Sequence, residues 1–262
     1  MNDLGASIDG VGADAQPAES VAAEIVAAGG SAIADTSDVA TVGGAAAAVG
    51  AAIERFGRID VLVANAGIIR WAAFPEADAE NLAGHLAVHV SGSFHAARAA
   101  WPHLVEQRYG RIVLTTSSGL LGLPNNTSYA TAKGAVVGLA RSLATAGAAH
   151  DVKVNLIAPA ATTRMAGAAG PPMPPESVAP MVAFLAHEDC PVTGEIYVAG
   201  AGRFARLFIA STEGYVHEGG APTVEDVADH WATINDDRAY FVPADLLEWS
   251  TRFLAHLPPD PS

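Results

Sequence analysis

Short apolar runs alternate with longer, alanine-rich segments along the first two hundred residues. Runs of four to seven residues predict strands, and segments of ten or more residues predict helices. The alternation is typical of βαβ units, so we expect an α/β fold with a doubly wound, parallel, Rossmann-like sheet. The run 59–64, apolar except for Asp60, predicts a strand buried on both faces. The expected strands are 31–34, 59–64, 111–116, 152–158 and 195–199, and the expected helices are 17–29, 39–56, 79–107, 127–147 and 175–187.

The pattern changes after residue 202. Segments 223–234 and 243–257 predict two helices, and Trp231, Trp249 and Phe253 give them apolar surface. We therefore divide the chain into a core, 1–202, and a helical C-terminal extension, 203–262, that packs on the core or on a second subunit. Within the core, 166–175 is rich in proline and glycine and predicts a flap or a surface loop.

Composition excludes several classes of protein. The chain has 262 residues, a formal net charge of −14 and 16% charged residues. This acidity argues against nucleic acid and anionic membranes as partners, since both attract basic surfaces. No apolar run is long enough to span a membrane, and the N-terminus lacks the features of a signal peptide. The single cysteine, Cys190, excludes an internal disulfide and predicts a cytoplasmic protein without a structural metal site.

Tyr129 and Lys133 carry the strongest chemical signal. Only two lysines occur in the chain, and this one follows a tyrosine by four residues in an expected helix. That spacing places both side chains on one helical face. An ammonium group lowers the pKa of a nearby phenol, which can then exchange a proton with an alcohol or a carbonyl. The alternative is an ordinary surface pair.

Two loops at the carboxyl ends of expected strands support this interpretation, because ligands of doubly wound sheets bind there. Residues 115–119 carry four consecutive hydroxyl groups that could hold a substrate oxygen beside Tyr129. The tripeptide Asn65-Ala66-Gly67 permits close approach of a flat cofactor. A strand end and a tight turn are the respective structural alternatives.

Together these residues resemble the short-chain dehydrogenase/reductase family over most of 1–202. The matching segments are Asn65-Ala66-Gly67, Thr116, Tyr129 with Lys133, and Asn155–Pro159. Within the family, the chain is most similar to the (3R)-hydroxyacyl-CoA dehydrogenase part of peroxisomal multifunctional enzymes of type 2 and to their stand-alone bacterial relatives. That similarity rests on residues 2–5, 88–94, 98–101 and 199–202 and on the extension.

The resemblance implies an NAD-dependent enzyme. It makes Tyr129 the catalytic acid/base, Lys133 the residue that lowers its pKa and holds the nicotinamide ribose, and Asp3 the acceptor for the adenine ribose. A carboxylate at this last position favours NAD, since it repels the 2′-phosphate of NADP. The remaining implied cofactor contacts come from Asp38 and Val39 at the adenine, from Asn65, Ala66 and Gly67, and from Thr163 at the carboxamide.

Three features depart from the family pattern. Thr116 occupies the position of the catalytic serine, thirteen residues before the tyrosine, with Ser118 as the alternative hydroxyl. His89 stands where a helix asparagine usually completes a proton relay; the alternative is a structural or surface histidine. The glycine-rich turn that binds the pyrophosphate is missing before Asp3. We expect either an upstream start with the missing strand and turn, or a remnant with impaired cofactor binding.

The leading hypothesis is an oxidoreductase that interconverts a secondary alcohol and a ketone, with 3-hydroxyacyl-CoA and 3-ketoacyl-CoA as the implied substrates. The alternatives are a dehydrogenase of another bulky alcohol, such as a steroid, and a non-catalytic assembly protein. We expect a homodimer or homotetramer with a small-molecule substrate. In the assembly-protein alternative, helices 79–107 and 127–147 form the oligomer interface.

Overall fold

The computed structural model describes residues 1–165 and 173–257, so most of the expected flap lies outside the described residues. The chain divides into two compact units, Met1–Arg206 and Leu207–Ser262. The division falls four residues beyond the predicted boundary at 202, because strand β5 (Arg203–Leu207) joins the sheet of the first unit. Among the described residues, no helix is both long and apolar enough to cross a membrane.

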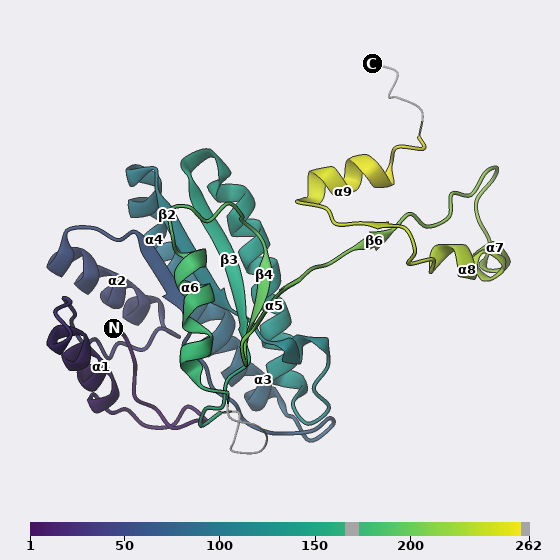
Figure 1. The fold of residues 1–262 in the computed structure, drawn as a ribbon. Helices are drawn as coiled ribbons and strands as arrows, with labels where there is room; N and C mark the ends of the chain where they lie inside the picture. The colour runs from purple at the N-terminus through teal and green to yellow at the C-terminus, as the bar shows by residue number, and fades with distance from the viewer. Residues whose placement is uncertain (166–172, 258–262) are drawn as a thin grey trace. The chain divides into compact units, whose positions relative to one another are not determined.

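The first unit contains a five-stranded sheet in the order β1-β2-β3-β4-β5, which confirms the predicted parallel, Rossmann-like fold (Figure 1). Strands β1 to β4 pair in parallel, so their carboxyl ends lie at one edge of the sheet. Strand β5 follows β4 after a two-residue turn in which Ala201 and Gly202 both have positive φ. The four parallel strands are β1 (Val61–Ala64), β2 (Gly110–Thr115), β3 (Val152–Pro159) and β4 (Ile196–Gly200).

The helices lie close to the positions that the sequence predicted. Helices α4 and α5 pack on β2, and α5 also packs on β3, while α6 lies on the opposite face (Figure 1). The expected helix 79–107 is continuous, but its middle turn is π-helical. The bounds are α1 (Gln16–Ala27), α2 (Val42–Phe56), α3 (Ala79–His85), the π-helical η1 (Leu86–Ser91), α4 (Gly92–Gln107), α5 (Thr127–Gly147) and α6 (Ala179–Leu185).

Two predictions about strands were wrong. Residues 31–34 form no strand, and a single bridge joins Asn2 to Asp35 instead. Strand β1 is not buried on both faces, since Val61 and Val63 are 38% and 43% exposed. Among the described residues β1 is an edge strand, so only β2 covers its hydrogen-bonding groups. An apolar run predicts that a segment is buried, but it does not show whether a second neighbouring strand is present to bury it.

The second unit is small, and its described residues contain three short helices within the two predicted helical segments, 223–234 and 243–257. Its helices are α7 (Val224–Asp229), α8 (Trp231–Ile234) and α9 (Leu246–Phe253), and strands β6 (Ser211–Thr212) and β7 (Tyr240–Phe241) pair in antiparallel fashion. Helix α7 begins with a capping box between Thr223 and Asp226. Trp249 and Phe253 stack one turn apart on α9, with ring centroids 4.6 Å apart.

Candidate active site

The first turn of α5 carries Tyr129 at the carboxyl edge of the sheet. Asn126 caps the helix, since its side-chain oxygen accepts a hydrogen bond from the Tyr129 backbone N–H at 3.0 Å. The amide nitrogen of Asn126 donates to the Arg70 carbonyl at 3.1 Å. Asn126 is fully buried, so this one side chain fixes the start of α5 against the segment that follows β1.

Lys133 lies one turn further along α5, on the same face as Tyr129. Its Nζ is 5.6 Å from the centre of the Tyr129 ring and donates to the Thr115 carbonyl at 2.8 Å. Both side chains are buried, which confirms that the Tyr129–Lys133 pair is no ordinary surface pair. Burial lowers the pKa of Lys133 to about 7.

Three successive hydroxyls at the end of β2 have three different partners. Thr115 donates to the Asn65 side-chain oxygen at 3.0 Å, and Thr116 donates to the Lys133 carbonyl at 2.7 Å. The hydroxyl beside the Tyr129 phenol belongs to Ser117, which is hydrogen-bonded to it. The structure thus gives Ser117 the contact that the sequence predicted for Thr116, and Thr116 instead ties β2 to α5.

The position of Ser117 shows why counting residues missed it. Alternate residues of an extended chain point in opposite directions, so neighbouring hydroxyls at a strand end cannot share one target. Ser117 lies twelve residues before Tyr129 rather than thirteen. The predicted alternative, Ser118, begins a short 3-10 turn beyond it, Ser118–Leu121. In the sequence, the only signal was the cluster of four hydroxyl residues at 115–118. That cluster did not show which of the four contacts Tyr129.

The electrostatic balance at Tyr129 differs from the one the sequence predicted. Burial raises the pKa of Tyr129 above its ordinary value, and the hydrogen bond from Ser117 opposes this rise. Lys133 is not among the causes of the pKa shift of Tyr129, and its ammonium donates to the Thr115 carbonyl. Ser117 is therefore the group that favours the phenolate in this structure.

The loop after β1 reaches the same cluster through His89. Asn65 is linked to Thr115, as described above, and Gly67 packs directly on the His89 ring. A Cβ atom at Gly67 would lie 2.7 Å from His89 Cε1, so a side chain cannot be accommodated there without movement. The His89 ring in turn meets the edge of the Tyr129 ring at 5.4 Å between centroids. Ala66 lies between Asn65 and Gly67 and is exposed.

The other predicted cofactor contacts lie on separate segments. Asp3 bonds to Asp35 through its backbone and accepts the Gly5 N–H at 2.8 Å. Asp38 is exposed, and Val39 packs against Gly92 at the start of α4. Thr163 is exposed in the loop after β3. Their roles at a cofactor stay predictions.

Comparison with known proteins identifies the family. Residues 1–172 match the short chain dehydrogenase family, and the chain belongs to it. It is 43% identical to a short-chain type dehydrogenase/reductase of Mycobacterium tuberculosis over 90% of this chain and 84% of that protein. A short chain dehydrogenase from Mycobacterium avium has the same fold, with a TM-score of 0.77 and 32% identity over 89% of this chain and 86% of that one.

The chain is also similar to part of longer enzymes. It is 38% identical to the mouse peroxisomal multifunctional enzyme type 2, over 90% of this chain but 33% of that protein. The full-length enzyme of that type from Drosophila melanogaster superimposes with a TM-score of 0.79 at 29% identity, covering 92% of this chain and 43% of that one. The family and its named members make this chain an oxidoreductase of the short-chain dehydrogenase/reductase class.

Proposed function

We propose that this enzyme is an NAD-dependent dehydrogenase that interconverts a secondary alcohol and a ketone. The observation that carries the proposal is the pairing of the half-buried Ser117 hydroxyl with the buried Tyr129 phenol, with the Lys133 ammonium one helical turn away. One hydroxyl can hold the substrate oxygen while the other exchanges its proton.

The residues have distinct roles in this proposal. Tyr129 takes the hydroxyl proton of the alcohol during oxidation and returns it during reduction. Ser117 donates a hydrogen bond to the substrate oxygen and orients it toward Tyr129. Lys133, while charged, stabilises the phenolate. Its charge is held in place by the Thr115 carbonyl.

The residues around Tyr129 fit the nicotinamide–ribose end of the cofactor. Lys133 and Tyr129 supply donors for ribose hydroxyls, and Ala66 and Gly67 leave the loop after β1 without bulky side chains. When bound, NAD supplies the hydride-accepting ring. Asp3 is the proposed acceptor at the adenine ribose, where its charge disfavours a 2′-phosphate.

A 3-hydroxyacyl-CoA is the proposed substrate, because the similar peroxisomal enzymes are named hydratase-dehydrogenases or multifunctional enzymes. The test measures NADH formation from NAD⁺ with (3R)- and (3S)-3-hydroxyacyl-CoA and with a hydroxysteroid. Turnover of one acyl-CoA epimer supports the proposal. Turnover of the steroid alone favours the dehydrogenase of another bulky alcohol, and turnover of none contradicts both.

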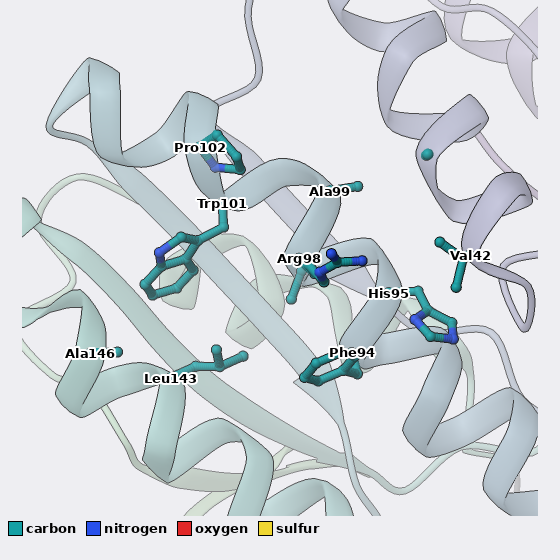
Figure 2. A pocket seen from close by; sticks show the side chains of 11 residues that line it. Val42, Phe94, His95, Arg98, Ala99, Trp101, Pro102, Leu143 and Ala146 are labelled. Atoms are coloured by element: carbon teal, nitrogen blue, oxygen red, sulfur yellow. The ribbon is translucent and has the colours of Figure 1, made fainter.

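We also propose a homodimer that forms over α4 and α5. An apolar groove of about 650 Å³ lies between α2, α4 and α5, with Trp101 and Leu143 on its walls (Figure 2). Phe94, Arg98 and Glu106 lie on one exposed stripe of α4, at four- and eight-residue spacing. An antiparallel second copy of α4 would place Arg98 opposite the partner's Glu106, and Arg98 has no ion pair with any residue the structure describes.

Light scattering tests the dimer. The unmodified chain should have twice the mass of the monomer, and Arg98→Glu should shift it to monomer by placing two carboxylates together. The charge swap Arg98→Glu with Glu106→Arg should restore the dimer. A monomeric wild type, or a dimer indifferent to both changes, would contradict the arrangement.

A further inference from the structure

The backbone of Arg70 is fixed beside the candidate active site. Its N–H donates to His85 Nε2 at 3.2 Å, and its carbonyl accepts from the side-chain amides of Asn81 and Asn126, each at 3.1 Å. Asn126 also accepts the Tyr129 backbone N–H, so one side chain connects Arg70 to the helix that carries Tyr129. The positions of Arg70 and Tyr129 are therefore set by the same residue.

The guanidinium of Arg70 is held by a backbone carbonyl rather than by a carboxylate. Its Nε donates to the Asp9 carbonyl at 2.7 Å. The Asp9 carboxylate accepts the Ser7 hydroxyl at 2.5 Å, and that bond, more than the charge of Arg70, lowers the pKa of Asp9. Within residues 1–165 and 173–257, Nη1 and Nη2 of Arg70 donate to no group and form no ion pair. The two terminal nitrogens are thus available to a ligand.

Two glycines leave room for this guanidinium. A Cβ atom at Gly84, in α3, would lie 3.0 Å from Nη1 of Arg70, and one at Gly10 would lie 3.7 Å from Nη2. Glycine is unfavourable within a helix, but at position 84 it allows the guanidinium to lie against α3. The Arg70 side chain remains partly exposed, so a ligand can reach it.

The free edge of the guanidinium has the geometry for a phosphate group. A planar guanidinium donates two parallel hydrogen bonds to two oxygens of a phosphate, and the charges add to the attraction. The chain has a formal net charge of −14, so a polyanionic ligand needs a local positive charge at its binding site. A backbone-held arginine without an ion pair supplies that charge.

We propose that Arg70 binds a phosphate group of a ligand that occupies the active site. The inference rests on the proposed function, which supplies two sources of such a group. One is the pyrophosphate of NAD, and the other is the set of phosphates of an acyl-CoA. Because Asn126 fixes both Arg70 and the start of α5, a phosphate on Arg70 holds its ligand at a constant distance from Tyr129.

Titration calorimetry with NADH and with CoA, at low ionic strength, tests the site and separates the two sources. Arg70→Met removes the charge from a side chain of similar reach, and it should weaken the binding of at least one ligand about ten- to a hundredfold. Arg70→Lys keeps the charge without the planar fork and should bind with intermediate affinity. Arg55→Met, in the last turn of α2, makes the same change in net charge and should bind both ligands like the wild type.

The ligand whose affinity falls identifies the source of the phosphate, and a truncated substrate supplies a second readout. A 3-hydroxyacyl-pantetheine thioester has the acyl group of the CoA substrate but lacks its pyrophosphate and 3′-phosphate. If the phosphates of CoA bind Arg70, Arg70→Met should lower kcat/KM at least about tenfold for the acyl-CoA and less than about twofold for the thioester. If the pyrophosphate of NAD binds there, the KM for NAD should rise and both substrates should respond alike.

Three results would overturn the inference, with affinities corrected for the folded fraction. The first is an Arg70→Met variant that binds NADH and CoA like the wild type. The second is an equal loss of affinity in Arg55→Met, which indicates an effect of net charge alone. The third is a wild type that binds neither ligand. A wild type that binds a ligand through Arg70 but forms no NADH from any alcohol would contradict the proposed function and leave the phosphate site in place.

Discussion

Lys133 donates from Nζ to the Thr115 carbonyl, 2.8 Å away, while the Thr115 hydroxyl donates to Asn65 at 3.0 Å. One residue at the end of β2 therefore holds both the ammonium group and the loop that follows β1. The position of the charge is set by the strand rather than by Tyr129. A substitution that moves the strand end should disturb the cofactor loop and the phenol together.

The buried Lys133 should make stability depend on pH above neutrality. Its folded-state pKa is about 7 against an ordinary value of 10.5, so between these values the unfolded chain binds more protons. The free energy of unfolding should therefore rise from pH 7 toward pH 10, by at most about 1.4 kcal/mol per pH unit. Below pH 7 both states are protonated, and this contribution is constant.

Urea unfolding at several pH values between 6 and 9.5 measures this slope. Lys133→Met, which keeps the length and removes the titrating group, should flatten it. Tyr129 contributes with the opposite sign only above about pH 10, since burial raises its pKa. His85 and His89 titrate below pH 6.5, since burial lowers their pKa values. Parallel curves for wild type and Lys133→Met would contradict the prediction.

Tyr129→Phe should lower kcat by about 10²- to 10⁴-fold and weaken NADH binding far less, because Lys133 keeps its own contact with the ribose. Phenylalanine keeps the ring that packs on His89 and loses only the hydroxyl. Stopped-flow turnover and fluorescence titration with NADH measure the two effects. Tyr197→Phe, on β4, is the matched control and should retain kcat. Retention of more than half the wild-type kcat by Tyr129→Phe would remove Tyr129 from the reaction.

Ser117→Ala and Thr116→Val distinguish the two hydroxyls at the end of β2. Ser117→Ala should lower kcat at least about tenfold, because it removes the group that orients the substrate oxygen and favours the phenolate. Thr116→Val should keep kcat within a few-fold but destabilise the fold by about 1 kcal/mol, since it removes the bond to the Lys133 carbonyl. A large loss of kcat in Thr116→Val with little loss in Ser117→Ala would indicate that Thr116, not Ser117, orients the substrate oxygen.

Asp3→Ser should reduce the preference for NAD over NADP at least about tenfold, since it removes a carboxylate that repels the 2′-phosphate. The measurement is the ratio of kcat/KM for the two cofactors. Asp9→Ser removes the same charge from the neighbouring turn and should leave the ratio unchanged. Equal kcat/KM for both cofactors in the unmodified protein would show that Asp3 has no part in the choice.

The sequence predicted most elements because each has a strong local period. Helix α5 begins and ends where its pattern indicated, at Thr127 and Gly147. The strand expected at 31–34 failed because only one bridge, at Asp35, pairs with the N-terminal residues. Strand pairing depends on residues far away in the sequence. A short apolar run therefore cannot show whether a partner strand is present.

The candidate site was predictable in its residue types but not in all of its contacts. The spacing of Tyr129 and Lys133 sufficed to place both on one face of α5. The choice of Ser117 depends on how the chain turns after β2, and the contact of His89 with Ile68 depends on a π-helical turn. Neither the turn after β2 nor the π-helical turn can be predicted from the hydrophobic pattern.

Because Gly67 has no side chain, the ring of His89 occupies the space that a side chain at position 67 would need. Any larger residue at position 67 would enter the space of the His89 ring, 2.7 Å from the expected Cβ. A substitution at position 67 is therefore tolerated only together with one at position 89. A side chain at position 67 requires a residue smaller than histidine at position 89. Among natural variants of this enzyme, positions 67 and 89 should change together, although they lie twenty-two positions apart in the sequence.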